Sequence, residues 1–256
     1  MTIHEFGAGN AGTIVMFHPL GVWWDIFEAV IPILERDYHL VVPAVPGFDP
    51  DRPDVDFTSV EAIASEMADW LIARGQRRVR CLYGCSMGGG VVARMLADGR
   101  VRPDCAVMDG GMTPYQLPKP VTWLIGARDW CMLELGKRAG PKLLRSVFDP
   151  EKYTEADLDY VRRVMRSMSA RTAWRSFYSC NNYAMPRPVP PPACPVQYWY
   201  GDQEAKARAW DIAYIRKAFP AAQLVENRGQ GHAEFFTLHP EAFCKQLNAF
   251  IEGARA

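Results

Sequence analysis

The sequence predicts an α/β fold in which helices cover both faces of a mostly parallel central sheet. Short apolar runs of strand length alternate with stretches of helical spacing before residue 118 and again after residue 193. Between these parts, residues 119–192 contain helical stretches and no clear strand. We therefore expect a core formed by residues 1–118 and 193–256, interrupted by a helical cap over residues 119–192.

The first part of the core shows the alternation most clearly. A continuous apolar run of four to eight residues is typical of a strand buried on both faces, whereas a short run at the start suits a sheet edge. The expected strands are Ile3–Phe6, Gly12–Phe17, His39–Pro43, Val79–Tyr83 and Asp104–Asp109.

Helices are expected between these strands. In residues 24–34, apolar side chains recur on one helical face. Thr58 and Glu61 have the spacing of a capping box, which predicts a helix that runs to Ala73 and ends before Gly75. Residues 91–97 form a third helical stretch directly after a glycine-rich turn.

The predicted cap and the second part of the core follow the same rules. Within the cap, Thr154 and Asp157 have capping-box spacing and open a helix that runs to Met168. The proline-rich residues 186–192 form a stiff connector. Afterwards we expect strands at Val196–Tyr200 and Gln223–Glu226, and helices over residues 206–219 and from Pro240 onward.

Composition limits the classes of function. The 256 residues carry 29 Lys or Arg and 29 Asp or Glu, a balance that does not favour nucleic acid or a membrane surface as a partner. The seven cysteines are scattered without a Cys-x-x-Cys pair, so we expect free thiols, no metal site and a cytoplasmic location. The first residues lack a basic region followed by an apolar stretch, and we expect no signal peptide.

The most informative motif is the pentapeptide Gly84-Cys85-Ser86-Met87-Gly88. It follows a predicted strand and precedes a predicted helix, which is the context of a nucleophile elbow. The tight turn strains the serine backbone and leaves no room for side chains two positions before and after it. The motif therefore indicates that Ser86 is a nucleophile, with a packing turn as the alternative.

A serine hydroxyl needs a base within hydrogen-bond reach, and the base needs an orienting acid. Glu204 and His232 each follow a later predicted strand, so they should meet Ser86 at the carboxyl edge of the sheet. The order serine, acid, histidine suits this architecture. Asp202, in the same turn as Glu204, and Asp109, after the preceding central strand, are alternative acids.

With these motifs, the chain resembles the α/β-hydrolase family over nearly its full length, and specifically its cap-bearing serine hydrolases. The resemblance includes His18-Pro19-Leu20-Gly21 after the first central strand and the pair Gly231-His232. It implies an α/β-hydrolase fold, Ser86 as nucleophile and His232 as general base. Members of the family commonly have Asp where this chain has Glu204.

The resemblance also implies an oxyanion hole. Its two donors would be the backbone N–H groups of Met87, after the nucleophile, and Leu20 in the loop after the first central strand. The family usually has glycine where this chain has Pro19. Proline has no N–H, but the donor required is that of the next residue.

The predicted function is hydrolysis of a small acyl substrate, a carboxylic ester or a thioester, without metal or organic cofactor. Carbon–carbon bond hydrolases and aminopeptidases or amidases of the same fold are the alternative, and a non-catalytic small-molecule receptor is the alternative of another class. The sequence does not determine the oligomeric state, and a homo-oligomer is one possibility. Large apolar side chains of the cap are expected to roof the substrate pocket: Trp123, Trp130, Trp174, Phe177 and Tyr178.

Overall fold

A computed structural model describes residues 1–115, 117–138 and 149–254. Its centre is a seven-stranded sheet with the order β1-β3-β2-β4-β5-β6-β7. The first strand pairs antiparallel with its neighbour and every other pair is parallel, which confirms the predicted mostly parallel sheet with an edge strand at the start. The strands are β1 (Thr2–Phe6), β2 (Thr13–Phe17), β3 (His39–Ala44), β4 (Arg78–Cys85), β5 (Arg102–Asp109), β6 (Val196–Gly201) and β7 (Gln223–Asn227).

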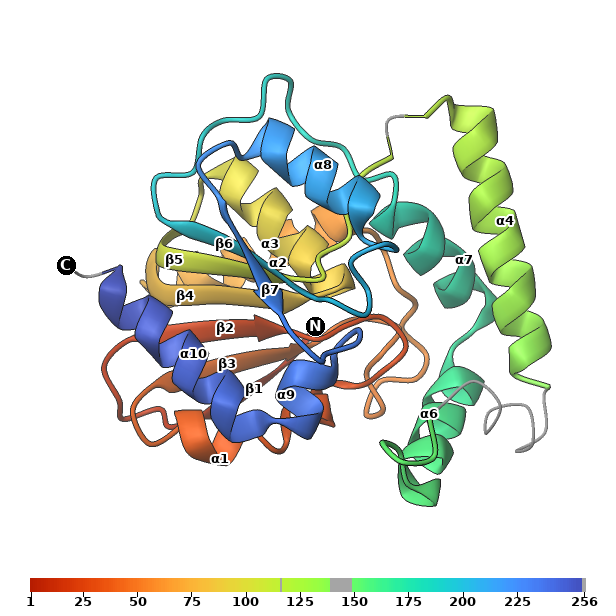
Figure 1. Cartoon of the computed structure of the whole chain (residues 1–256), viewed down its shortest axis with the longest axis horizontal. Coiled ribbons are helices and arrows are strands. Elements are labelled where there is room, and N and C mark those ends of the chain that lie inside the picture. The colour runs from red at the N-terminus through yellow and green to blue at the C-terminus, as the bar shows by residue number, and fades with distance from the viewer. Residues whose placement is uncertain (116, 139–148, 255–256) are drawn as a thin grey trace.

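Helices cover both faces of the sheet (Figure 1). One face carries α2 (Val60–Ala73), α3 (Met87–Asp98) and α8 (Ala209–Ala218). The other face carries the 3-10 helix η1 (Trp24–Phe27), α1 (Ile31–Leu34), α9 (Glu234–Leu238) and α10 (Pro240–Gly253). The parallel strands are thereby shielded on both sides, which explains why they read as continuous apolar runs.

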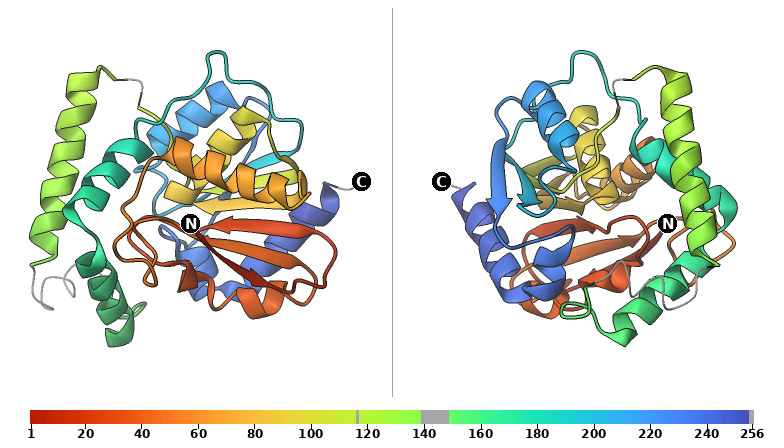
Figure 2. Two further views of the ribbon diagram at one scale, coloured as in Figure 1. Left: turned by 180° about the vertical axis from the view of Figure 1, so that it is seen from behind. Right: turned by 45° about the vertical axis from the view of Figure 1, so that its right-hand side comes forward.

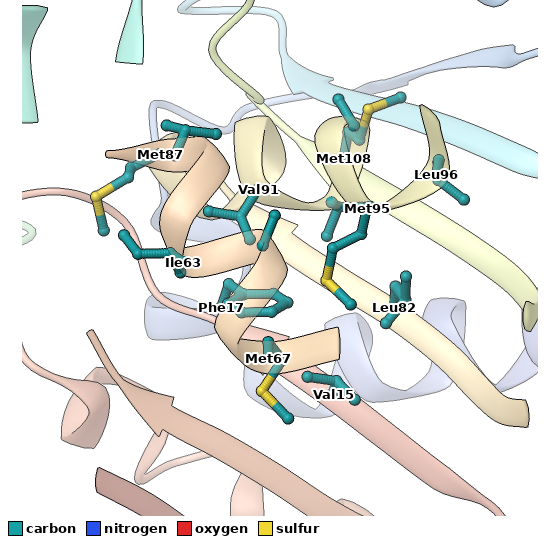
Figure 3. Close-up of a cluster of buried hydrophobic side chains, with 14 of the residues drawn as sticks. Val15, Phe17, Ile63, Met67, Leu82, Met87, Val91, Met95, Leu96 and Met108 are labelled. Atoms are coloured by element: carbon teal, nitrogen blue, oxygen red, sulfur yellow. The ribbon is translucent and has the colours of Figure 1, made fainter. Parts of the chain in front are cut away.

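Two apolar clusters fill the space between the sheet and its helices. In the first, shown in Figure 3, Phe17 and Leu82 of the sheet pack among Ile63 and Met67 of α2 and Val91 of α3. All five side chains are completely buried. Burial of one such side chain stabilises the fold by about 1.5–3 kcal/mol, so the clusters hold the strand ends in fixed positions.

Three further helices, called the inserted helices here, lie between β5 and β6 in the chain: α4 (Lys119–Gly136), α6 (Glu155–Ser167) and α7 (Ala170–Cys180). They stand beside the sheet, at the side toward which β2 points (Figures 1 and 2). Part of the predicted cap, residues 139–148, lies outside the described residues. Among the residues described, no helix has the length and apolarity that a membrane crossing requires.

The capping box predicted at Thr154 is confirmed. The Thr154 hydroxyl accepts a hydrogen bond from Asp157 N at 3.3 Å, and the Asp157 carboxylate accepts one from Thr154 N at 2.7 Å. Reciprocal capping of this kind satisfies two backbone donors that the first helical turn leaves open.

The single helix predicted over residues 24–34 is wrong. The structure has η1 at Trp24–Phe27 and a separate short α1 at Ile31–Leu34. Pro32 lies in the first turn of α1, where its missing N–H is harmless, but it would break a helix that continued from residue 24. The apolar side chains still face the core because Phe27, Ile31 and Leu34 are all buried.

Two predicted helix starts are also corrected. The cap of α2 is Ser59 rather than Thr58, since the Ser59 hydroxyl accepts a hydrogen bond from Ala62 N at 3.1 Å. The helix predicted from residue 206 begins at Ala209, because residues 202–208 form consecutive turns after β6. These turns are the segment that carries Glu204.

Candidate active site

Ser86 occupies a strained turn between β4 and α3. Its φ of 52° and ψ of −113° lie outside the regions that L-residues normally adopt. Backbone hydrogen bonds hold it there: Ser86 N donates to Asp109 O at 2.8 Å, and Met112 N donates to Ser86 O at 2.9 Å. Strain of this kind costs about 1–3 kcal/mol and persists only where the surroundings impose it.

The glycines of the pentapeptide are required by contact with backbone atoms. A Cβ atom on Gly84 would lie 2.2 Å from the carbonyl oxygen of Gly88, and one on Gly88 would lie 2.2 Å from that of Phe17. Both distances are far shorter than any real carbon–oxygen contact. The steric expectation for the two glycines is thus confirmed, and the first turn of α3 lies directly against the end of β2.

The structure brings His232 and Glu204 together. His232 Nδ1 lies 2.6 Å from Glu204 Oε2, and Gly201 N donates to Glu204 Oε1 at 3.2 Å. Glu204 is only 7% exposed, and an ionised carboxylate can only accept, so Nδ1 carries the proton and donates. Burial by itself would raise the pKa of Glu204, but the hydrogen bond and charge of His232, together with the Gly201 N–H and the charge of Arg208, outweigh it, and the pKa is lowered.

The pair lies beside the turn that contains Ser86. A Cβ atom added to Gly110 would be 3.0 Å from the His232 ring and 3.1 Å from Glu204 Oε1. Gly110 follows Asp109, whose carbonyl accepts the Ser86 N–H. Ser86 and His232 both lie within the described residues, but no hydrogen bond joins the Ser86 hydroxyl to the His232 ring. Hydrogen bonds of this kind commonly tighten only in the substrate complex.

A charged network supports Glu204 from behind. Arg208 Nε lies 3.6 Å from Glu204 Oε2, and Arg208 Nη1 lies 3.2 Å from Asp211 Oδ2. Asp211 in turn accepts hydrogen bonds from both the backbone N–H and the hydroxyl of Thr113, each at 2.8 Å. Burial raises the pKa of Asp211, against the opposing effect of Arg208. The network links the turn after β6 to the segment after β5.

The two alternative acids have other partners. Asp202 is exposed, and its carboxylate accepts a hydrogen bond from Gly229 N at 2.9 Å. Asp109 is buried, and its carboxylate accepts a hydrogen bond from the Tyr83 hydroxyl at 2.7 Å. Burial raises the pKa of Asp109 to about 6. The pKa values of Asp109 and Glu204 are therefore shifted in opposite directions beside the same imidazole.

The loop after β2 lies next to the elbow because of strand register. Phe17 pairs with Gly84, so Leu20 and Met87, the residues expected to donate to an oxyanion, each follow a paired position by three residues. His18 is completely buried, its Nδ1 is 2.8 Å from Pro19 O, and its Nε2 accepts from Val45 N at 3.3 Å. Burial lowers the pKa of His18 to about 4, so it is a neutral side chain that holds the loop.

The aromatic residues predicted to roof a pocket contact one another. The rings of Trp123 and Trp174 lie 5.8 Å apart, and Tyr178 stacks on Trp174 at 5.8 Å. Trp130 Nε1 donates to Ala170 O at 3.0 Å. Trp123 is 52% exposed, and none of the contacts described for Trp123, Trp130, Trp174, Phe177 or Tyr178 reaches Ser86 or His232. Their assignment to a substrate pocket stays a prediction.

Sequence reasoning missed the residues that connect the inserted helices to the site. Lys152 Nζ lies 2.9 Å from Glu234 Oε2, which also accepts from Gly231 N at 2.7 Å. On the other side, the Tyr160 hydroxyl donates to Asp25 at 2.7 Å, close to the loop after β2. Glu234 is two residues from His232, a proximity that could have drawn attention to it, but its partner Lys152 is 82 residues away in the sequence.

The fold and this arrangement define the class of the protein as an α/β hydrolase. A model of the alpha/beta hydrolase family matches residues 14–246, and the chain belongs to that family. Among curated proteins, none matches the sequence.

Solved structures of hydrolases share the fold. A thermophilic esterase from Thermogutta terrifontis is 17% identical with a TM-score of 0.74, and 100% of this chain and 94% of that chain are covered. A hydrolase from Oleispira antarctica is 15% identical with a TM-score of 0.75, with 98% and 94% covered. The epoxide hydrolase CorEH is 16% identical with a TM-score of 0.74, with 98% and 94% covered. At these identities the likeness concerns the fold.

Proposed function

We propose that the protein is a serine hydrolase that cleaves a small carboxylic ester or thioester through an acyl-enzyme. Ser86 is the nucleophile, His232 the general base and Glu204 the acid that orients it. The observation that carries the proposal is the 2.6 Å contact between His232 Nδ1 and Glu204 Oε2 beside the strained turn of Ser86. With the proton on Nδ1, the Nε2 lone pair is available to accept the Ser86 proton.

In the first half of the reaction, Ser86 Oγ attacks the substrate carbonyl carbon while its proton passes to His232 Nε2. The N–H groups of Leu20 and Met87 donate to the oxygen on which negative charge develops. The carbon–oxygen or carbon–sulfur bond then breaks, and the proton on Nε2 leaves with the alcohol or thiol. The acyl group remains on Ser86 as an ester.

In the second half, water attacks the acyl carbon and His232 accepts one of its protons. The bond to Ser86 Oγ breaks, the proton returns to the serine oxygen, and the carboxylic acid is released. Glu204 remains ionised throughout, which fits its lowered pKa, and stabilises the imidazolium in both halves. Asp109 is less suited to this role because its raised pKa favours the neutral acid.

The inserted helices are proposed to act as a cap that selects the substrate, with residues 119–192 as the cap boundaries. Support comes from the contacts of Tyr160 near the loop after β2 and of Lys152 beside the His232 loop. The seven cysteines carry free thiols, which supports a reducing, cytoplasmic compartment.

Labelling with a fluorophosphonate tests the nucleophile. We expect one equivalent to attach at Ser86, none in Ser86→Ala, and strongly reduced labelling in His232→Ala. Ser167→Ala, which removes an exposed hydroxyl at the end of α6, should label like the wild type. Folded protein that fails to label, as the receptor alternative predicts, would overturn the proposal.

A hydrolysis panel distinguishes the bond types. p-Nitrophenyl esters, acyl thioesters, aminoacyl amides and a carbon–carbon bond substrate are compared, with Ser86→Ala as the blank. Turnover of esters or thioesters supports the proposal. Turnover of amides alone, or of the carbon–carbon substrate alone, would replace it by the aminopeptidase or carbon–carbon hydrolase alternative.

A further inference from the structure

Five arginines line a hollow of about 1090 Å³ at the end of the molecule opposite the inserted helices. The hollow lies where β4 and β5 begin and where α2 and α3 end, near the C-terminus marked in Figure 1. Asp104 is the one acidic residue in its lining. The arginines are Arg77, Arg78, Arg80, Arg100 and Arg102.

Strand pairing forces some of these like charges together. Arg78 on β4 and Arg102 on β5 are register partners, and Arg102 N donates to Arg77 O at 2.7 Å. Like charges directly opposite one another destabilise a sheet. The chain as a whole has equal numbers of basic and acidic residues, so the excess of arginine here is local.

Protein carboxylates neutralise only part of this charge. Asp104 accepts hydrogen bonds from Arg78 Nε at 2.7 Å and from Arg80 Nη1. Arg100 pairs with Asp69 on α2. Among residues 1–115, 117–138 and 149–254, no carboxylate pairs with Arg77 or Arg102.

Arg80, which lines the hollow, also has an unsatisfied donor. Its Nε is buried, and no described group accepts its proton. A buried donor without an acceptor is unfavourable and is rare in folded proteins. Asp104 meanwhile holds the Arg80 guanidinium in place through Nη1, so the open donor belongs to an oriented group.

We propose that this hollow binds the phosphate groups of a small molecule that carries a diphosphate. Guanidinium groups match phosphate oxygens through paired hydrogen bonds, and Arg77 and Arg102 supply charge that no described carboxylate balances. The hollow is slightly larger than a typical small-molecule pocket, so it has room for a diphosphate together with an organic group. Apolar wall residues, Ile72 and Leu96 among them, provide a surface for that group.

Isothermal titration calorimetry at low ionic strength tests the proposal, with pyrophosphate and ADP as probes. We expect saturable binding of one equivalent to the full-length protein. Arg77→Gln/Arg102→Gln should weaken binding by about tenfold or more, because each change removes a charged, paired donor. Arg166→Gln/Arg216→Gln makes the same change of charge at exposed positions outside the hollow and should bind like the wild type.

The two probes distinguish the source of the diphosphate. Tighter binding of ADP assigns the site to an organic diphosphate, and equal binding assigns it to free pyrophosphate. Failure of both probes to saturate, or equal weakening by both double variants, would overturn the proposal.

Thermal unfolding supplies a second measurement. Without anion, Arg77→Gln/Arg102→Gln should melt at the same or a higher temperature than the wild type, because like-charge repulsion is relieved. With pyrophosphate, the wild type alone should gain stability through linkage. The proposed site would be contradicted if the double variant had a lower melting temperature than the wild type without anion and if pyrophosphate raised the melting temperatures of both proteins equally. Fluorophosphonate labelling at Ser86 should be unchanged in Arg77→Gln/Arg102→Gln. The test of the arginine hollow is thereby independent of the test of the proposed function.

Discussion

The α/β core and the inserted helices are held in place by different kinds of contact. In the core, strands such as β2 and β3 are buried along their whole length, and two apolar clusters bind the helices to them. The inserted helices contact the core through hydrogen-bonding side chains and a few apolar ones, Leu133, Met165 and Cys180, which join or pack against the first cluster. On α4, Leu124 and Met132 are more than 60% exposed.

The polar contacts of the inserted helices join residues far apart in the chain. The Thr172 hydroxyl on α7 accepts from Phe57 N at 3.0 Å, and Ser179 accepts from Val60 N at 2.9 Å. The Tyr160 contact spans 135 residues. Continuous apolar burial holds the core together, whereas the inserted helices combine a small number of apolar contacts with directional hydrogen bonds.

The largest expected effect concerns the core. Gly88→Ala would place a Cβ atom 2.2 Å from the Phe17 carbonyl oxygen, where backbone rather than a flexible side chain must move. We expect a loss of more than about 4 kcal/mol in the free energy of unfolding, or no folded protein. Gly253→Ala is the control, because no atom lies within 4 Å of the added Cβ. Urea unfolding measures both, and a wild-type midpoint for Gly88→Ala would contradict the tight-turn argument.

The next effect concerns chemistry at the carboxyl edge of the core. Glu204→Gln keeps the shape of the side chain that contacts His232 Nδ1 but removes the charge that stabilises the imidazolium in the proposed mechanism. The rate of fluorophosphonate labelling should fall by about 10²- to 10⁴-fold. Asp202→Asn, an exposed neighbour in the same turn, should label at nearly the wild-type rate. If Asp202→Asn showed the larger loss, the assignment of the acid would be reversed.

A pH-dependent effect follows from Asp109. Its folded pKa of about 6 lies above the ordinary value of 3.8, so the folded state holds the proton more tightly than the unfolded state. The favourable contribution of Asp109 is present below pH 4 and is lost as pH rises through 6. Asp109→Asn removes this loss, so its stability relative to the wild type should improve by about 3 kcal/mol between pH 4 and 8.

Urea unfolding at several pH values measures the Asp109 effect. Asn can still accept the Tyr83 hydrogen bond, so the pH dependence of the difference, not its absolute size, is the decisive quantity. Asp202→Asn is the control, since Asp202 is exposed. A difference between Asp109→Asn and wild type that stays constant with pH would refute the raised pKa.

The smallest effect concerns the attachment of the inserted helices. Lys152→Met removes the ion pair with Glu234, whose carboxylate keeps its bond from Gly231 N. We expect a loss of about 1–2 kcal/mol, confined to the inserted helices and measured by hydrogen exchange of α6 and α7. Lys206→Met, at an exposed position, should have no such effect. Faster exchange across the central strands would instead show that Lys152 stabilises the whole molecule.

Much of the core could be predicted from the sequence. Local patterns predict its strand positions and the glycines around Ser86, and they also predict the capping box that opens α6 at Thr154. Apolar runs and capping side chains act within a few residues of the chain. The break before Pro32 also follows from a local signal, because a proline cannot lie inside a continuous helix, whereas apolar spacing alone suggests one helix over residues 24–34.

The surroundings of the candidate site could be predicted only in part. The sequence order of Ser86, Glu204 and His232 suggested that they meet, but it left Asp202 and Asp109 open as acids. The 2.6 Å contact of Glu204 with His232 depends on the turns that follow β6, and the Tyr83 partner of Asp109 depends on where β4 lies beside β5.

By itself, the sequence determined the alternation of strands and helices and the strained turn at Ser86, since both rest on side chains and backbone close together in the chain. Only the tertiary structure decided which carboxylate faces His232, which residues attach the inserted helices, and that five arginines share one hollow. Those features arise where separate strand ends and loops meet, and hydrogen bonds and charges there depend on distances that a local pattern does not encode.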